Sequence, residues 1–226
     1  MKICMVGTGR MAVSHSRAFS ALPGVQLHSV VNPRLEYAEA FAHEQGYERG
    51  LASLDEALER GGCDAVVICT PNALHYPQSM AALRAGCHVL TELPLAMSLA
   101  EAEELGRMAQ AQDRRLMVCH TERYEAGRIE LRRRVQAGEF HPLHLAMRFW
   151  MLRRGELRTE QAHHGWVDNM LWHHGSHVVD AAMDILGPHE AQGLSAHWGP
   201  VWPSMGAPLD VALQWRAASP ITGDVA

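Results

Sequence analysis

The sequence predicts an α/β protein in two parts, a doubly wound parallel sheet followed by a smaller α+β domain with an open sheet. A strand-like run leads directly into a glycine-rich turn at the N-terminus, and short apolar runs then alternate with helical patterns up to about residue 120. Such alternation is typical of a parallel sheet with helices on both faces. The pattern changes beyond Arg123, so we place the domains at residues 1–121 and 122–226.

The glycine-rich turn follows the apolar run 3–6 and has the spacing G-x-G-x-x-A. In a dinucleotide-binding unit, Gly7 would allow the tight turn, Gly9 would let the backbone approach a pyrophosphate, and Ala12 would let the next helix pack close to the strand. Apolar residues at helical spacing continue until Pro23. We therefore predict a cofactor-binding turn formed by Gly7, Thr8, Gly9, Arg10 and Met11.

The second apolar run, 25–31, ends at Asn32-Pro33-Arg34. Dinucleotide-binding folds place an acidic residue here against the ribose 2′-hydroxyl, or an arginine nearby when a 2′-phosphate is bound. This chain has no acid at that point, and a neutral amide with a guanidinium suits a 2′-phosphate. The sequence favours NADP, with NAD possible, and the alternative is that Arg34 only begins a solvent-exposed helix.

The rest of the first domain supplies further ligand candidates. We predict strands at 65–69, 87–90 and 116–119, and helices at 35–45, from Ser53 to about residue 61, 72–85 and from Ser98 to about residue 112. Both serines begin capping boxes. Because ligands lie beyond the carboxyl ends of parallel strands, we expect cofactor contacts from Thr70, Pro71, Asn72, His75, Glu92 and Pro94. His75 and Glu92 could also be structural residues.

The second domain begins with a predicted helix at 129–135 and a strand at 143–151. A polar loop at 153–168, a helix at 177–185 and strand-like stretches at 192–197 and 209–215 follow. The chain ends a few residues into what resembles a further strand, which would leave an unpaired sheet edge. We therefore expect this domain to be incomplete.

Composition narrows the function classes. The 226 residues are 47% hydrophobic with a formal net charge of -5, which argues against disorder and against a nucleic-acid partner. There is no apolar stretch of membrane-spanning length and no signal-peptide pattern, so we expect a cytoplasmic protein without a membrane partner. The five cysteines include no C-x-x-C pair, and buried reduced thiols are expected.

Several motifs together resemble the glucose-fructose oxidoreductase, inositol dehydrogenase and rhizopine-catabolism family. The matching segments are 7–12, Cys69-Thr70-Pro71-Asn72 with His75, Glu92-Leu93-Pro94, 120–124, and Gly175-Ser176-His177 with Asp180. The resemblance implies an N-terminal Rossmann domain that binds a nicotinamide cofactor. It also implies a C-terminal sheet that carries the substrate and forms the contacts of a homo-oligomer.

Two positions depart from the family pattern. The family usually has Glu-Lys-Pro where this chain has Glu92-Leu93-Pro94. Leu93 therefore replaces the lysine that helps to deprotonate a substrate hydroxyl. The family's usual aspartate, four positions before the histidine, is here His173. With these two departures, the chain resembles the 4-carboxy-2-hydroxymuconate-6-semialdehyde dehydrogenase branch of aromatic catabolism. The further residues that carry this resemblance are 171–174, Arg153-Arg154 and Gly165-Trp166. That branch implies NADP-dependent oxidation of a cyclic dicarboxylate hemiacetal to 2-pyrone-4,6-dicarboxylate.

Hydride transfer from a hemiacetal carbon needs a base for the hydroxyl proton, but a weaker base suffices than for a simple alcohol. We predict His177 as the general base and His173 as the residue that orients it or the substrate, since imidazole titrates near neutral pH. Guanidinium groups suit a dicarboxylate substrate. The predicted substrate-side residues are Arg123, Arg153, Arg154, His120, Trp166 and Trp172, any of which could instead be a surface or core residue.

The sequence is also compatible with three other functions. His173 and His177 with His163 or His164 could hold zinc in a hydrolase, but no H-E-x-x-H signature accompanies them and we expect no metal. A dehydrogenase of sugars or inositols is the alternative within enzymes. Loss of the lysine and the aspartate could also leave a cofactor-binding sensor without turnover.

Overall fold

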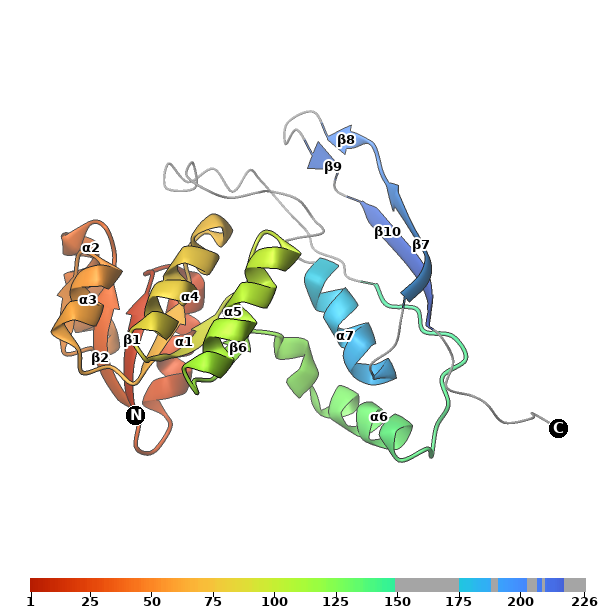
Figure 1. Cartoon of the computed structure of the whole chain (residues 1–226), viewed down its shortest axis with the longest axis horizontal. Coiled ribbons are helices and arrows are strands. Elements are labelled where there is room, and N and C mark those ends of the chain that lie inside the picture. Colours follow the sequence, from red (N-terminus) through yellow and green to blue (C-terminus); the bar gives the residue numbers. More distant parts are fainter. Residues whose placement is uncertain (149–174, 188–190, 203–206, 209, 218–226) are drawn as a thin grey trace. The chain divides into compact units, whose positions relative to one another are not determined.

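The computed structural model describes residues 1–148, 175–187, 191–202, 207–208 and 210–217 (Figure 1). They form two compact units, one with the described residues up to Cys119 and one with those from His120 onward. No helix in these described ranges is long and apolar enough to cross a membrane.

The first unit is built on a six-stranded sheet. Its strands are β1 (Lys2–Val6), β2 (Gln26–Val31), β3 (Arg49–Leu51), β4 (Ala65–Ile68), β5 (His88–Thr91) and β6 (Leu116–Val118). All pairs are parallel, in the order β3-β2-β1-β4-β5-β6. The chain moves outward on one side of β1 and then returns to its other side with β4, which is the topological switch point where doubly wound sheets bind ligands. The predicted doubly wound parallel sheet is confirmed.

The helices of this unit follow the capping signals of the sequence. They are α1 (Arg10–Ser20), α2 (Leu35–Gln45), α3 (Leu54–Arg60), η1 (Asn72–Leu74), α4 (His75–Arg84) and α5 (Leu99–Ala111). The Ser53 hydroxyl accepts the Glu56 backbone N–H at 3.1 Å, and the Ser98 hydroxyl accepts that of Glu101 at 3.2 Å. Each serine satisfies an N–H that has no partner within its helix, so the two predicted capping boxes are confirmed.

Two apolar clusters cover the two faces of the sheet. In β1, Cys4 and Val6 pack on one face while Ile3 and Met5 pack on the other, as the two-residue period of a strand requires. Residues of α3, α4 and α5 belong to the first cluster and residues of α1 and α2 to the second. Burial on both faces explains why these strands are continuous apolar runs.

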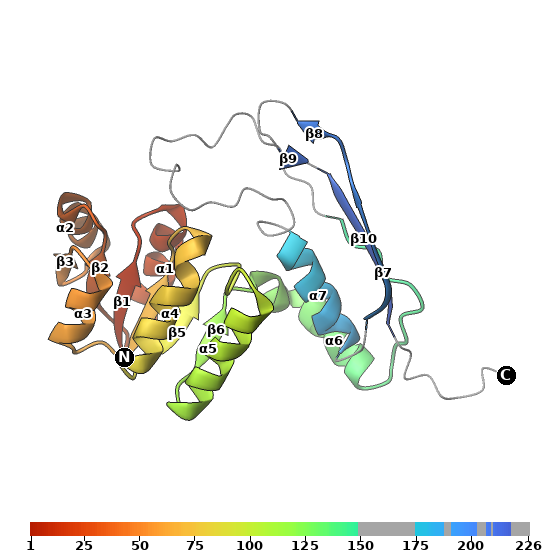
Figure 2. The same ribbon diagram turned by 45° about the horizontal axis from the view of Figure 1, so that its top comes forward.

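The second unit combines helices with antiparallel strand pairs. Its elements are η2 (Thr121–Tyr124), α6 (Ala126–Gln136), α7 (Ser176–Leu186), β7 (Ala191–Trp198), β8 (Val201–Trp202), β9 (Ala207–Pro208) and β10 (Val211–Ala217). The cyan helix α7 lies beside the green helix α6, and β7 runs along β10, in both views (Figures 1 and 2). A mixed helical and antiparallel unit is the predicted α+β class.

One predicted element is wrong where the structure describes it. Residues 143–148, the described part of the strand expected at 143–151, contain no strand. Leu143 is 90% exposed, and Leu145 and Met147 are only partly buried, so the alternating side chains lack the continuous packing surface that would hold a strand in a sheet. The predicted polar loop at 153–168 lies outside the described residues.

Candidate functional site

The N-terminus of α1 has the features of an anion site. Its N-cap residue, Gly9, provides no side-chain cap, and the first turn contains no acidic residue. The first N–H groups of a helix have no partners within the helix and carry partial positive charge, so this end suits a phosphate. A Cβ at Gly9 would meet nothing within 4 Å, which leaves room for a ligand close to the backbone. These residues fit the pyrophosphate of a dinucleotide.

Gly7 has a different function in the same turn. Its φ of +107° is rarely adopted by residues with a side chain, and a Cβ would lie 2.4 Å from the Cys69 carbonyl oxygen. Its N–H donates to the Val31 carbonyl oxygen at 2.9 Å, which ties the turn to the end of β2. A glycine at position 7 is therefore required by the backbone of the turn, whereas the space beside Gly9 is empty and could admit a ligand.

The end of β2 holds the predicted ribose-side residues. The Asn32 amide donates to the Thr8 hydroxyl at 2.7 Å and accepts the Arg34 backbone N–H at 2.9 Å. The Arg34 guanidinium lies 3.8 Å from the centre of the Tyr37 ring. This cation–π contact holds the side chain in place without an ion pair to a carboxylate. Asn32 thus links the glycine turn to an exposed guanidinium.

The end of β4 is tied to the end of β5 by His75. This side chain is 1% exposed, with Nε2 2.8 Å from the Thr70 carbonyl oxygen and Nδ1 2.7 Å from the Pro94 carbonyl oxygen. Both nitrogens face the backbone, so the geometry favours the structural alternative for His75 over a cofactor contact. At the end of β4, the Thr70 hydroxyl donates a hydrogen bond to Oε1 of Gln78 at 2.6 Å. At the end of β5, the Leu93-Pro94 peptide bond is cis.

Glu92 is part of a cluster that sequence reasoning did not detect. Its Oε1 lies 2.6 Å from Nε2 of His15, which comes from the second turn of α1, and the same nitrogen lies 3.5 Å from the Cys119 sulfur. Burial, with the Glu92 carboxylate, raises the pKa of the Cys119 thiol to about 12. The cluster joins α1 to the carboxyl ends of β5 and β6, and its members are too far apart in sequence to form a local motif.

In the second unit, two carboxylates of α7 hold the neighbouring helices. Asp180 accepts hydrogen bonds from Nε, at 2.8 Å, and Nη2 of Arg123. Asp184, one turn later, accepts from Nη1 of Arg132 at 2.7 and 3.0 Å. The Arg123–Asp180 pair is bidentate, through two guanidinium nitrogens, and such a pair fixes geometry as well as charge. Arg123, predicted to bind a substrate carboxylate, is thus used to position α7.

His120 lies beside the same carboxylate. Its Nδ1 is 3.4 Å from Asp180 Oδ2. Burial lowers the pKa of His120, the Asp180 carboxylate opposes this shift, and Arg123 and His177 add to it. A neutral imidazole is therefore favoured in the folded protein over a wider pH range than in the unfolded chain.

This shift predicts a pH effect on stability. The folded pKa of His120 lies below the unfolded value, so the unfolded chain binds the proton first and stability falls as the pH drops below about 6.5. Replacing His120 by glutamine should reduce this loss between pH 7.5 and pH 5, as measured by urea unfolding at each pH. A difference between wild type and His120→Gln that does not change with pH would contradict the assignment.

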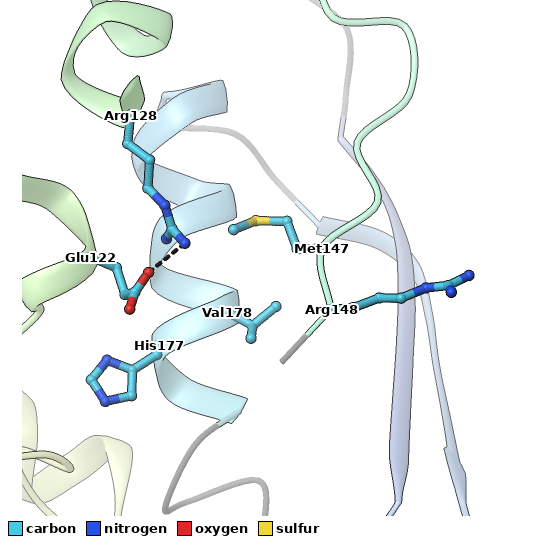
Figure 3. A pocket seen from close by; sticks show the side chains of 6 residues that line it. All are labelled: Glu122, Arg128, Met147, Arg148, His177 and Val178. Atoms are coloured by element: carbon cyan, nitrogen blue, oxygen red, sulfur yellow. Dashed lines mark ion pairs between the residues drawn. The ribbon is translucent and has the colours of Figure 1, made fainter. Parts of the chain in front are cut away.

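Near His120, the second unit contains a cavity of about 210 Å³. It is lined by Glu122, Arg128, Met147, Arg148, His177 and Val178. In Figure 3, His177 extends from the start of α7, Glu122 pairs with Arg128, and the Arg148 guanidinium is directed away from that pair. The predicted base His177 therefore lines a cavity. Glu122 also lines it and lies in the matching segment 120–124, although no role was predicted for it, whereas Arg128 belongs to no motif of the sequence.

Several predicted site residues lie outside the described part of the chain, namely His173, Arg153, Arg154, Trp166 and Trp172. Their roles stay predictions. The remaining cofactor-side predictions are placed at the ends of parallel strands. Arg10 and Met11 begin α1, while Pro71 and the buried Asn72 begin η1 after β4.

A parallel sheet with a glycine turn at its switch point defines a dinucleotide-binding class of fold. Comparison with known families gives the same class. Residues 1–120 match the model of the oxidoreductase family with an NAD-binding Rossmann fold, and residues 127–223 match that of the C-terminal region of bacterial oxidoreductases. The chain belongs to the Gfo/Idh/MocA oxidoreductase family, as the sequence motifs predicted.

The names of individual relatives describe different substrates. The 4-carboxy-2-hydroxymuconate-6-semialdehyde dehydrogenase of Sphingobium sp. is 30% identical over 96% of this chain and 68% of its own length. The D-glucoside 3-dehydrogenase of Escherichia coli is 27% identical over 87% of this chain and 57% of its own length. The WlbA dehydrogenase of Bordetella pertussis, solved with NADH and UDP-GlcNAcA, has a TM-score of 0.83 at 23% identity, covering 96% of this chain and 64% of that one. The chain thus spans 57% to 68% of the length of these relatives.

Proposed function

We propose that this chain is an NADP-dependent dehydrogenase that oxidises the cyclic hemiacetal of 4-carboxy-2-hydroxymuconate semialdehyde to 2-pyrone-4,6-dicarboxylate. The observation that carries the proposal is the combination of a missing lysine and a histidine that lines a cavity. Leu93 stands where the family usually has a lysine, and His177 lines the cavity of the second unit. An imidazole in place of an ammonium group suits a hemiacetal, whose hydroxyl is more acidic than that of a polyol. The similarity to the Sphingobium enzyme over almost the whole chain supports the same substrate.

In the proposed reaction, His177 accepts the hydroxyl proton as the carbinol C–H bond breaks and the ring carbonyl forms. Its Nδ1 is buried, so we assign the proton to Nε2. A bound nicotinamide cofactor supplies the hydride acceptor. The N–H groups of α1, with Gly9, would hold its diphosphate. Since Arg123 is already paired with Asp180, recognition of the substrate carboxylates falls mainly to Arg153 and Arg154.

The test is a comparison of substrates on the purified full chain. Cyclic hemiacetal, glucosides and inositols are each offered with NADP and NAD, and formation of reduced nicotinamide is followed by absorbance. Fastest turnover with the dicarboxylate hemiacetal supports the proposal. Fastest turnover with a neutral polyol would assign a sugar or inositol dehydrogenase instead, and cofactor binding without turnover of any substrate would favour a sensor.

The cofactor preference is tested separately at Arg34. Arg34→Ala should weaken NADP binding roughly tenfold to a hundredfold, the effect of losing about 1.5–3 kcal/mol of charge-assisted hydrogen bonding, while NAD binding changes little. Dissociation constants from nicotinamide titrations measure both. Arg17→Ala, an exposed arginine on α1, is the matched control. Equal losses for the two cofactors would show that Arg34 does not read the 2′-phosphate.

A further inference from the structure

We propose that His15, Glu92 and Cys119 form a binding site for a thiophilic divalent metal ion, with Zn²⁺ as the preferred ion. One ligand atom from each residue lies within 4.8 Å of the other two. Imidazole nitrogen, thiolate sulfur and carboxylate oxygen are the three donor types that zinc uses in proteins. These three ligands are different residues from the histidines that the sequence offered for zinc, and the site does not require a hydrolase.

The distances suit a tetrahedral ion. Zinc bonds of about 2.0–2.3 Å at tetrahedral angles place neighbouring ligand atoms about 3.4–3.6 Å apart. The His15 nitrogen and the Cys119 sulfur are already 3.5 Å apart. The His15 to Glu92 separation of 2.6 Å has to open by about 0.8 Å to reach 3.4 Å, which a small rotation of the glutamate side chain provides.

The backbone fixes the three ligands from different elements. Glu92 directly follows β5 and Cys119 directly follows β6, and these strands are hydrogen-bonded neighbours. Cys119 N–H donates to the Thr91 carbonyl oxygen at 2.9 Å, which sets the two positions side by side. His15 enters from α1, where its ring stacks on Phe19 with centroids 6.2 Å apart. Ligands held by a sheet and a packed ring lose little freedom on binding an ion.

Burial leaves the site sheltered but open to an ion. The side chains of His15 and Glu92 are 14% and 16% exposed, and Cys119 is buried. A water molecule can complete the fourth position. With three protein ligands and a water molecule in place of four protein ligands, we expect weaker binding than at a structural zinc site, with a dissociation constant on the order of 1 µM.

The experiment uses the full chain, reduced and freed of metal. Zn²⁺ binding is measured by calorimetry, and Co²⁺ is used as a spectroscopic probe because cobalt bound to a thiolate gives a near-ultraviolet charge-transfer band. We expect one equivalent of Zn²⁺ and a cobalt band that zinc abolishes. Cys119→Ser should remove the band, and Cys119→Ser and His15→Gln should each weaken zinc binding roughly a hundredfold or more.

Cys63→Ser is the matched control, because Cys63 is a partly buried thiol of the same unit whose sulfur lies 3.7 Å from that of Cys87. It should keep both the band and the affinity. Thermal unfolding of each apo variant shows whether it is folded, and His15→Gln retains a hydrogen-bonding group for Glu92. The proposal is overturned if the wild type binds no zinc at 100 µM, or if the band survives Cys119→Ser and disappears in Cys63→Ser.

Discussion

Replacing His177 by alanine is expected to lower kcat for the hemiacetal by a factor of about 10² to 10⁴, the usual contribution of a positioned general base. The imidazole lines the cavity at the start of α7, and Leu93 provides no ammonium group that could take over proton removal. KM and the dissociation constant for NADP should change little, since the residue acts on the proton in the transition state. Steady-state kinetics and a cofactor titration measure the three quantities.

A structural effect can be separated from this chemical one. His144→Gln changes an exposed histidine of the same unit and should leave kcat unchanged. The space left in His177→Ala should also let added imidazole restore part of the rate, which a misfolded variant would not show. Retention of more than a tenth of the wild-type kcat without imidazole would rule out His177 as the base.

Local chemistry explains which parts of the fold could be predicted. The capping serines, Ser53 and Ser98, act on residues three positions away, and the buried runs of β1 and β4 are apolar on both faces. Strand β3 was not predicted because three residues, of which only Leu51 is buried, carry no periodic signal. The pattern at 143–148 is alternating but forms no strand, because a period of two predicts a strand only where a packing surface exists.

The site was predicted only in part for a related reason. Single residues at strand ends, such as Asn32 and Glu92, follow from the parallel topology. Contacts between elements do not, and the His15, Glu92 and Cys119 cluster joins residues 77 and 104 positions apart. The case of Arg123 is similar, because its pairing with Asp180 spans 57 positions. A sequence motif identifies the residue type, whereas the partner that occupies its charge becomes visible only in the fold.

The two glycines of the turn should respond in opposite ways to the same added methyl group. Gly7→Ala places a Cβ 2.4 Å from the Cys69 carbonyl oxygen at a φ of +107°, so backbone must shift in the middle of the sheet. We expect a loss of about 2–4 kcal/mol in the free energy of unfolding and a Tm lower by roughly 10 °C. Urea and thermal unfolding of the cofactor-free chain measure this directly.

Gly9→Ala is the matched variant, because its φ of -80° is ordinary and its Cβ would meet nothing within 4 Å. Its unfolding free energy should stay within about 0.5 kcal/mol of wild type, and a small gain is possible because alanine restricts the unfolded chain. Its dissociation constant for NADP should rise at least roughly tenfold, since the methyl group occupies the space through which a diphosphate reaches the N–H groups of α1. If Gly9→Ala bound NADP as tightly as wild type, the open space at this turn would have no part in cofactor binding, and the anion site at α1 would have to be abandoned.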